Sequence, residues 1–292
     1  MATAKKVACV EIGGIPISLT TDNPAFFDLL TRRYEGYLSS SPAQCALEFD
    51  IVAAGSVSDD DVRVKREGAE WRIERGDFFA RWDPRSGRGI VRQNANPYAL
   101  DSVLRILHSL ILADQGGFLL HAASGICEGH ACLFSGVSGA GKTTMTRLAP
   151  ADITLLTDEI SYVRPGKNTD SAAYVAFGTP FAGELARPGE NTKAPIAGLF
   201  FLEQGPGNRI DEIPSGDAVR RLMRNILFFA EDPRLVEQVL ATACDFVSRI
   251  PIRCLMFYPT SKVWGEVRGF VRDSSRRSAA HDRAPEGVNA HV

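Results

Sequence analysis

Residues 119–144 read LLHAASGICEGHACLFSGVSGAGKTT and decide the expected fold of the chain. Short apolar runs, the last of them at 131–135, lead directly into a glycine loop at 136–144. Short apolar runs bounded by turn residues predict strands, and the chain from Gly141 to about Leu148 predicts a helix. Because so short a strand–turn–strand unit cannot be a parallel crossover, we expect its two strands to form an antiparallel hairpin.

The glycine loop predicts phosphate binding. Gly136, Gly141, Lys142 and Thr143 match the pattern G-x4-G-K-[ST], in which backbone N–H groups surround phosphate oxygens and the next helix points its positive end at them. We expect Lys142 to contact the β- and γ-phosphates of ATP and Thr143 to bind Mg²⁺. The alternative is a glycine turn without a ligand. The predicted nucleotide-binding residues are Gly136, Val137, Ser138, Gly139, Ala140, Gly141, Lys142, Thr143 and Thr144.

Asp158 and Glu159 form a pair of acids at the end of the predicted strand 153–157. Ligands often meet an α/β sheet at strand ends, and two adjacent carboxylates allow one to bind Mg²⁺ while the other accepts a proton. A solvated acidic turn is the alternative. His121 ends an earlier strand, where a histidine taken alone is more often structural. Glu184 and Arg187 are weaker candidates for a metal-side acid and a phosphate clamp.

The chain divides by its patterning into two domains and a tail. Residues 1–95 contain a predicted hairpin around Gly13-Gly14, a helix capped by Asp22 or Asn23, and short runs separated by turns, which together predict a small α+β domain with an antiparallel meander. Residues 96–272 contain the glycine loop. Residues 273–292 are polar and aperiodic, which predicts disorder.

Further helices and strands are expected in the second domain. The first helix spans about 98–114, where apolar residues recur at helical spacing, and it includes His108 as a packing or surface residue. A helix capped by Ser215 is expected to reach Leu227, and a second begins at Asp232-Pro233. Predicted strands lie at 174–177, 196–202 and 252–257.

Composition limits the classes of function. The net charge is −2 and 45% of residues are hydrophobic, so no global field favours nucleic acid or an anionic membrane. No apolar stretch is long enough for a membrane span, and the N-terminus does not resemble a signal peptide. Six scattered cysteines predict reduced thiols, so we expect a cytoplasmic protein. The acidic run Asp59-Asp60-Asp61 predicts a solvated loop rather than a metal site.

Three segments in a fixed order resemble the HPr kinase/phosphorylase family and its HPr-kinase-like relatives. They are residues 119–144, LLTDE at 155–159 and FGTPFAGE at 177–184. The glycine loop is also similar to that of the phosphoenolpyruvate carboxykinases, more distantly. The resemblance covers about 118–205, a third of the chain.

The resemblance implies an α/β fold with a P-loop core of the HPr-kinase/carboxykinase type and a mixed sheet. Carried over by position, it makes Asp158 the catalytic base and places His121 beside it as an orienting group. Lys142 completes the catalytic set, while Thr143 and Glu159 bind the metal. The implied cofactors are ATP and Mg²⁺, and a homo-oligomer is allowed.

Together these features predict an ATP- and Mg²⁺-dependent kinase that phosphorylates a hydroxyl, a serine of a peptide or small protein. Similar relatives are encoded with peptide-modification systems, which implies a peptide acceptor. Two alternatives stay open: an ATP-binding regulatory partner protein without phosphotransfer, and a small-molecule kinase.

Overall fold

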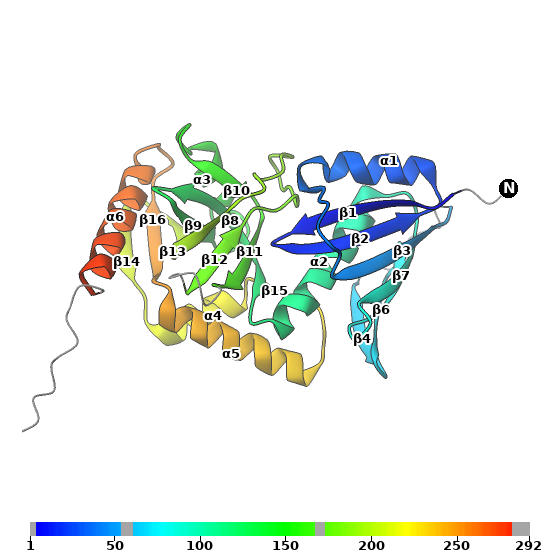
Figure 1. Cartoon of the computed structure of the whole chain (residues 1–292). Coiled ribbons are helices and arrows are strands. Elements are labelled where there is room, and N and C mark those ends of the chain that lie inside the picture. The colour runs from blue at the N-terminus through cyan, green and yellow to red at the C-terminus, as the bar shows by residue number, and fades with distance from the viewer. Residues whose placement is uncertain (1–3, 54–60, 167–172, 282–292) are drawn as a thin grey trace, which may run out of the picture.

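The computed structural model describes residues 4–53, 61–166 and 173–281, which form two mixed β-sheets with few helices (Figure 1). The fold is predominantly β, so the predicted α/β P-loop kinase core is wrong. The physical reason lies between 160 and 204, where β11, β12 and β13 follow one another as antiparallel neighbours and the described residues between them form no helix. Parallel pairing in this sheet is confined to β13, which has β9 and β16 as its parallel neighbours among the described strands.

The first sheet has seven strands in the order β1-β2-β3-β7-β6-β5-β4. Its elements are β1 (Lys6–Ile12), β2 (Ile15–Thr21), α1 (Pro24–Arg33), η1 (Glu35–Tyr37), β3 (Cys45–Ile51), β4 (Arg63–Glu67), β5 (Glu70–Arg75), β6 (Phe78–Asp83) and β7 (Arg88–Gln93). The predicted hairpin at Gly13-Gly14 is confirmed, and Asn23 caps α1 by accepting from Phe26 N at 2.9 Å.

The antiparallel meander predicted for this sheet is wrong at β3. This strand pairs in parallel with both β2 and β7, because α1 and η1 carry the chain across from β2. Asp59 and Asp60, for which a solvated loop was predicted, lie outside the described residues.

The second sheet has nine strands, seven of them in the order β10-β8-β11-β12-β13-β16-β14, while β9 pairs with β8 and β13, and β15 pairs with β8. The elements of this part are α2 (Pro97–Asp114), β8 (Phe118–Cys127), β9 (His130–Ser135), α3 (Lys142–Arg147), β10 (Thr154–Thr157), β11 (Ile160–Pro165), β12 (Tyr174–Phe177), β13 (Lys193–Gln204), β14 (Arg209–Glu212), α4 (Ser215–Met223), β15 (Ile226–Leu227), α5 (Pro233–Arg249), β16 (Ile252–Phe257) and α6 (Val263–His281).

Two predicted boundaries in this part are wrong. The helix expected to reach Leu227 ends at Met223, because the following residues pair with β8 as β15; its N-cap is Pro214, not Ser215. The predicted disordered tail begins too early, since α6 continues to His281. The first turns of this helix bury Val263, Trp264 and Val267 in the core. The rest of that prediction concerns 282–292, outside the described residues.

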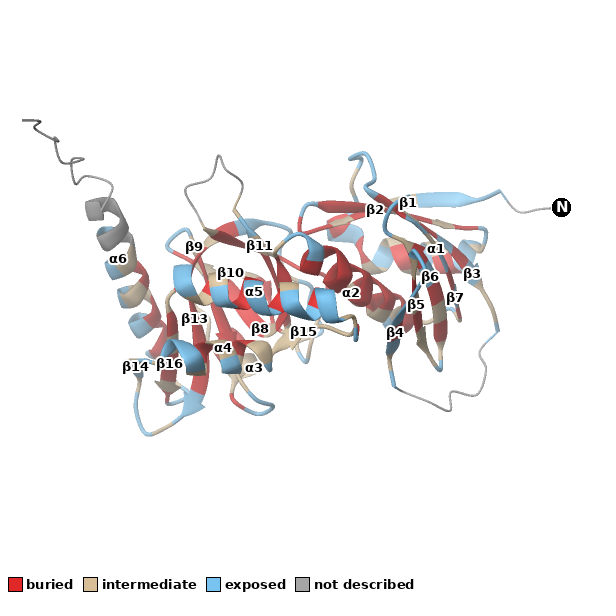
Figure 2. Ribbon diagram, turned by 90° about the horizontal axis from the view of Figure 1, so that it is seen from below, coloured by how far each residue is buried: buried red, intermediate tan, exposed pale blue. Residues whose placement is uncertain are grey.

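A continuous core joins the two sheets through α2. Leu104, Leu107 and other residues of α2 pack in one buried cluster with the strands of the first sheet and with Leu119 of β8 and Tyr162 of β11. In Figure 2 the ribbon of α2 is almost entirely buried where it crosses between the sheets. The first sheet is therefore a fixed neighbour of the glycine loop's sheet. No helix of the described ranges is long and apolar enough to cross a bilayer, and all six cysteines are unpaired.

His108 of α2 is a packing residue, as predicted, and is fully buried. Its Nδ1 lies 3.0 Å from the Tyr162 hydroxyl, across the junction between the sheets. Burial disfavours the imidazolium, and Arg164 adds repulsion, so the pKa of His108 falls to about 3. The ring is therefore neutral in the folded protein at neutral pH.

We expect this histidine to make stability fall in acid. The unfolded chain gains a proton on His108 below a pH of about 6.5, whereas the folded chain does not until about 3. The unfolding free energy that the neutral His108 ring contributes is fully present above its unfolded pKa. It declines as the pH drops, and the loss reaches about 3 kcal/mol at pH 4. Urea unfolding at pH 7 and pH 4 measures this loss. Between the two pH values, the unfolding free energy of His108→Gln should fall by about 3 kcal/mol less than that of the wild type. Equal losses in the two proteins would refute the buried neutral imidazole.

Candidate active site

Strand β8 changes its partners at His121 and Ala122. Its first half, through His121, pairs with β11 and β15, whereas its second half pairs with β9 and β10. Ser135, the last residue of β9, lies opposite Ala122, so the glycine loop leaves the sheet at this point. The exchange of partners therefore brings the loop next to His121.

The acidic pair lies at the same exchange point. Asp158 and Glu159 form the bend between β10, which pairs with the second half of β8, and β11, which pairs with the first. The Thr157 hydroxyl holds this bend by accepting from Glu159 N at 3.2 Å and Ile160 N at 3.1 Å. The prediction that the pair follows directly on a strand is confirmed.

The glycine loop has the backbone of a phosphate cradle. Gly136, Gly139 and Gly141 all have positive φ, at 156°, 78° and 112°, which L-residues rarely adopt. The first N–H groups of α3 have no intrahelical acceptor, and Lys142, Thr143 and Thr144 of this first turn line the pocket that the loop borders. Lys142 Nζ lies back over the loop, donating to Gly136 O at 3.0 Å and Val137 O at 3.4 Å.

The conformation of Gly141 supports a sharp prediction. A Cβ there would overlap the buried ring of Phe257, and the positive φ adds strain. We expect Gly141→Ala to cost about 1–3 kcal/mol of unfolding free energy and to weaken MgATP binding by at least tenfold, as urea titration and calorimetry can measure. Gly216→Ala is the control, since a Cβ there meets nothing within 4 Å in α4. If Gly141→Ala had the stability and the MgATP affinity of the wild type, the loop would not depend on the positive φ at this position.

Not every predicted loop residue faces the pocket. Those that line it are Ser138, Gly139, Gly141, Lys142, Thr143 and Thr144. Val137 is 78% exposed, and Ala140 is buried in the core beneath the loop. Gly136 does not line the pocket, and its carbonyl accepts a hydrogen bond from Lys142 Nζ.

Asp158 is buried and holds the opposite wall of the pocket. Its Oδ1 accepts from Gly183 N at 2.8 Å and its Oδ2 from Leu185 N at 2.9 Å. Gly183 is packed so closely that a Cβ would come within 2.9 Å of Glu159 Cβ. Asp158 thus fixes the 182–185 segment, a structural role that the sequence did not predict.

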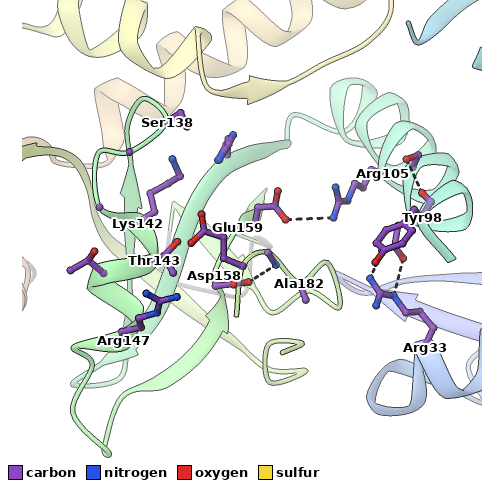
Figure 3. A pocket seen from close by; sticks show the side chains of 18 residues that line it. Arg33, Tyr98, Arg105, Ser138, Lys142, Thr143, Arg147, Asp158, Glu159 and Ala182 are labelled. Atoms are coloured by element: carbon purple, nitrogen blue, oxygen red, sulfur yellow. Dashed lines mark hydrogen bonds and ion pairs between the residues drawn. The ribbon is translucent and has the colours of Figure 1, made fainter. Parts of the chain in front are cut away.

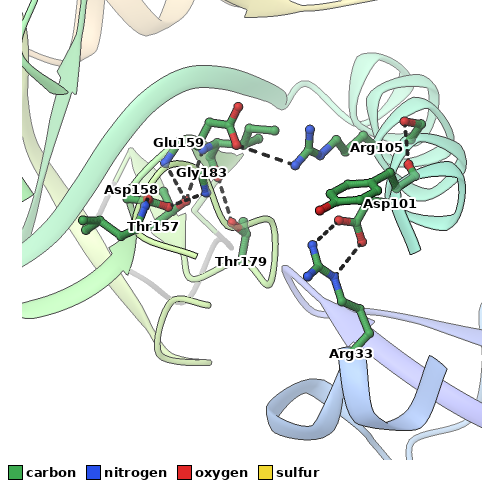
Figure 4. Close-up of polar contacts among 12 residues, drawn as sticks. Arg33, Asp101, Arg105, Thr157, Asp158, Glu159, Thr179 and Gly183 are labelled. Atoms are coloured by element: carbon green, nitrogen blue, oxygen red, sulfur yellow. Dashed lines mark hydrogen bonds and ion pairs between the residues drawn. The ribbon is translucent and has the colours of Figure 1, made fainter. Parts of the chain in front are cut away.

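Glu159 is half-buried and faces the far end of the pocket. Its Oε2 lies 3.7 Å from Arg105 Nη2 of α2, as Figures 3 and 4 show. Burial raises the pKa of Glu159, against the opposing effect of Arg105, and the Asp158 charge raises it further. A carboxylate with a raised pKa accepts a proton more readily near neutral pH than an ordinary glutamate does.

His121 is half-buried between the loop and the acids. Burial lowers the pKa of His121, and the nearby charges of Lys142 and Arg105 lower it further. Burial also lowers the pKa of Lys142, while the carboxylates of Glu159 and Glu184 act against that effect. His121 is therefore a neutral imidazole at pH 7, able to donate or accept a hydrogen bond.

All the predicted catalytic and metal residues line one pocket of 620 Å³: Lys142, Thr143, Asp158, Glu159 and His121 (Figure 3). Glu184 also lines it and is exposed, in keeping with its weak assignment. Arg187 does not; it is on the surface, 3.8 Å from Glu190.

The sequence analysis missed the wall that α1 and α2 provide. Arg33, Tyr98, Asp101, Ser102 and Arg105 all line the pocket. Asp101 is 3% exposed, pairs with Arg33 and accepts the Tyr34 hydroxyl at 2.6 Å. The missed signal was Asp101 and Arg105 on a mostly apolar helix, because a buried charge such as Asp101 needs a partner or a function.

Several oxygen-bearing side chains in the pocket are of the types that bind Mg²⁺ together with phosphates. Among the described residues no cluster of three or more His, Cys, Asp or Glu side chains could hold a metal ion alone. Mg²⁺ usually takes one or two carboxylates and completes its shell with substrate phosphates and water. The Thr143 hydroxyl, the pocket acids and the glycine cradle provide that kind of site.

The comparison with known proteins corrects the family. Residues 97–272 match the family described as ScmC, the SynChlorMet cassette protein ScmC. No curated protein matches the chain. The resemblance of the three segments within 118–205 to the HPr kinase/phosphorylase family therefore gave the wrong family, because the matched range extends well beyond those segments on both sides. Since the match covers more than half of the 292 residues, the chain belongs to the ScmC family.

Proposed function

We propose that this protein is an ATP- and Mg²⁺-dependent kinase that transfers the γ-phosphoryl group to a hydroxyl, that of a serine in a peptide or small protein. The observation that carries the proposal is one pocket in which Lys142 and Thr143 of the glycine loop face Glu159 and Asp158. A cation, a hydroxyl ligand and paired carboxylates around a phosphate cradle are what phosphoryl transfer needs.

The glycine loop binds the phosphates in this proposal. ATP would displace the Lys142 ammonium from the carbonyls of Gly136 and Val137 and take it as a partner for the β- and γ-oxygens. The loop N–H groups and the first turn of α3 would face the same oxygens. Mg²⁺, held by Thr143 with Asp158, would supply neutralising charge on the phosphates.

The two acids exchange the roles that the resemblance implied. Asp158 has both oxygens on backbone N–H groups, so it is suited to hold a fixed wall and a metal rather than to turn toward an acceptor. Glu159 has a raised pKa and, within the described part of the chain, no backbone donor of that kind, so it is the better base for the acceptor hydroxyl. His121 lies beside it and would orient the acceptor oxygen.

The transfer is balanced without any further reactant. The acceptor oxygen forms a bond to the γ-phosphorus, and the bond from that phosphorus to the β–γ bridging oxygen breaks. ADP keeps the electron pair of the broken bond. The hydroxyl proton goes to the Glu159 carboxylate.

A nucleotide-binding partner protein without phosphotransfer is the second candidate. The buried hydrogen bonds of Asp158 favour this candidate. They hold the carboxylate in a structural role at a position where a kinase could have its catalytic base. A small-molecule kinase would keep the same residues and change only the acceptor.

A phosphotransfer screen separates these readings. The full chain is incubated with MgATP and a pool of serine peptides, and each peptide is examined by mass spectrometry for the gain of one phosphoryl group. Phosphorylated peptides support the kinase. MgATP binding by calorimetry without transfer to peptides or to a set of small alcohols would overturn it in favour of the binding protein.

The proposal includes a cytoplasmic location. Six unpaired cysteines, four of them buried, agree with a reducing compartment that also supplies ATP.

A further inference from the structure

A second cavity of 230 Å³ opens on the other side of the catalytic groups. It shares Ser102, Arg105, His121 and Glu159 with the phosphate pocket, and contains none of the glycine loop. Glu159 and His121 therefore stand between two spaces, one bordered by the phosphate cradle and one not.

The wall of the second cavity is mainly apolar. Val62, Ile106, Ile160, Leu227 and Phe229 line it. Val62 belongs to the first sheet's part of the chain and Leu227 to β15 of the second, so the cavity lies at the junction between the sheets. An isolated bridge between Val64 and Ala230 ties the two sides together beside it.

The one cation that this wall adds is already neutralised. Arg75 donates to Asp77 at 2.6 and 2.8 Å and to the Ser102 hydroxyl at 3.1 Å. An anionic ligand would have to compete with that carboxylate, whereas an apolar group would not. The wall therefore favours an apolar occupant.

Arg105 marks the border between the two spaces. Its guanidinium stacks over Phe181, with 5.0 Å from Cζ to the ring centroid, and its Nη2 reaches Glu159 only at 3.7 Å. Its Nε is buried without a hydrogen-bond partner among the described residues. An unpaired buried donor is costly, so an oxygen of a bound substrate at this border would stabilise it.

We propose that the second cavity is the acceptor pocket: it takes an apolar side chain next to the serine that is phosphorylated, and it places the serine hydroxyl between Glu159 and His121. The inference rests on the proposed kinase function. A peptide carbonyl beside the serine would accept from Arg105 Nε. The apolar side chain would lie against Leu227 and Phe229.

The size of the cavity sets the class of side chain. Sites for whole drug-sized ligands occupy roughly 300–1,000 Å³, so 230 Å³ suits one apolar side chain. The acceptor class is thus a peptide with an apolar residue beside its serine, and the first sheet contributes to the choice through Val62.

Direct binding tests the pocket without relying on transfer. The probes are N-acetyl-Leu-Ser-Leu-amide and N-acetyl-Gly-Ser-Gly-amide, titrated into the full chain with saturating MgADP and followed by NMR or calorimetry. The leucine probe should bind about tenfold tighter or more, the size expected for removing a leucine side chain from water. Leu227→Trp, which fills the cavity, should abolish that preference.

Controls keep the outcome interpretable. MgADP binding reports that each variant is folded, Val62→Trp provides a second way to fill the cavity, and Leu240→Trp on the surface of α5 should keep the preference. Equal affinities of the two probes for the wild type would overturn the acceptor pocket, as would a preference that survives both filling variants. If the wild type prefers the leucine probe and this preference depends on Leu227, but no hydroxyl is ever phosphorylated, the apolar peptide-binding pocket is supported and the kinase function is refuted.

Discussion

Replacing Lys142 by methionine is expected to reduce phosphotransfer by about 10³-fold. Methionine keeps the length of the side chain but removes the ammonium that faces the γ-phosphate, and electrostatic stabilisation of that charge is a large part of catalysis. Steady-state kinetics with MgATP measures the loss. We expect most of it in kcat, because the charge on the moving phosphoryl group develops in the transition state.

The fold should not suffer from this change. Lys142 is partly exposed, and its recorded hydrogen bonds go to two carbonyls of its own loop. Lys65→Met on the exposed side of β4 is the matched control and should keep full activity. If Lys142→Met kept an activity within tenfold of the wild type, the lysine of the glycine loop would have no role in phosphoryl transfer.

Glu159→Gln is expected to lower kcat by about 10²–10⁴-fold, the usual worth of a positioned general base. Glutamine has the same shape but takes no proton from the acceptor. MgATP affinity should change much less than kcat, since this carboxylate also pairs with Arg105 of α2 (Figure 4). Glu266→Gln, a change at an exposed acid in the first turn of α6, serves as the control.

The pH profile adds an independent readout for Glu159. Its pKa is raised by burial, so wild-type activity should rise with pH as this carboxyl loses its proton, at a higher pH than for an ordinary glutamate. Glu159→Gln should lose that acidic limb. An unchanged limb in the variant would assign the proton transfer to another group, with Asp158 the first alternative.

Local structure was predictable from local signals. The Gly13-Gly14 hairpin, the Asn23 and Asp232 caps and the apolar spacing of α2 all gave the right elements. The fold class was not predictable in this way. Strand β8 exchanges partners at His121, and β3 pairs in parallel on both sides, which depends on tertiary pairing that no short window contains.

The site was predictable where a motif carries the chemistry. Lys142, Thr143 and the acidic pair line one pocket, because the glycine loop and the bend after β10 meet the same point of β8. Arg33 and Arg105 were not predictable, since they reach the pocket from helices with no motif. The role of Asp158 could not be read from its spacing either, because its partners are backbone N–H groups of another loop.

Phosphotransfer in water labelled with ¹⁸O tests the central claim most directly. The full chain, MgATP and a serine peptide with flanking leucines are incubated, and both phosphate products are examined by mass spectrometry. The account predicts a phosphorylated peptide whose new phosphate carries no solvent ¹⁸O, formed in step with ADP. ADP accompanied only by inorganic phosphate that carries one solvent oxygen would contradict it, since the acceptor would then be water.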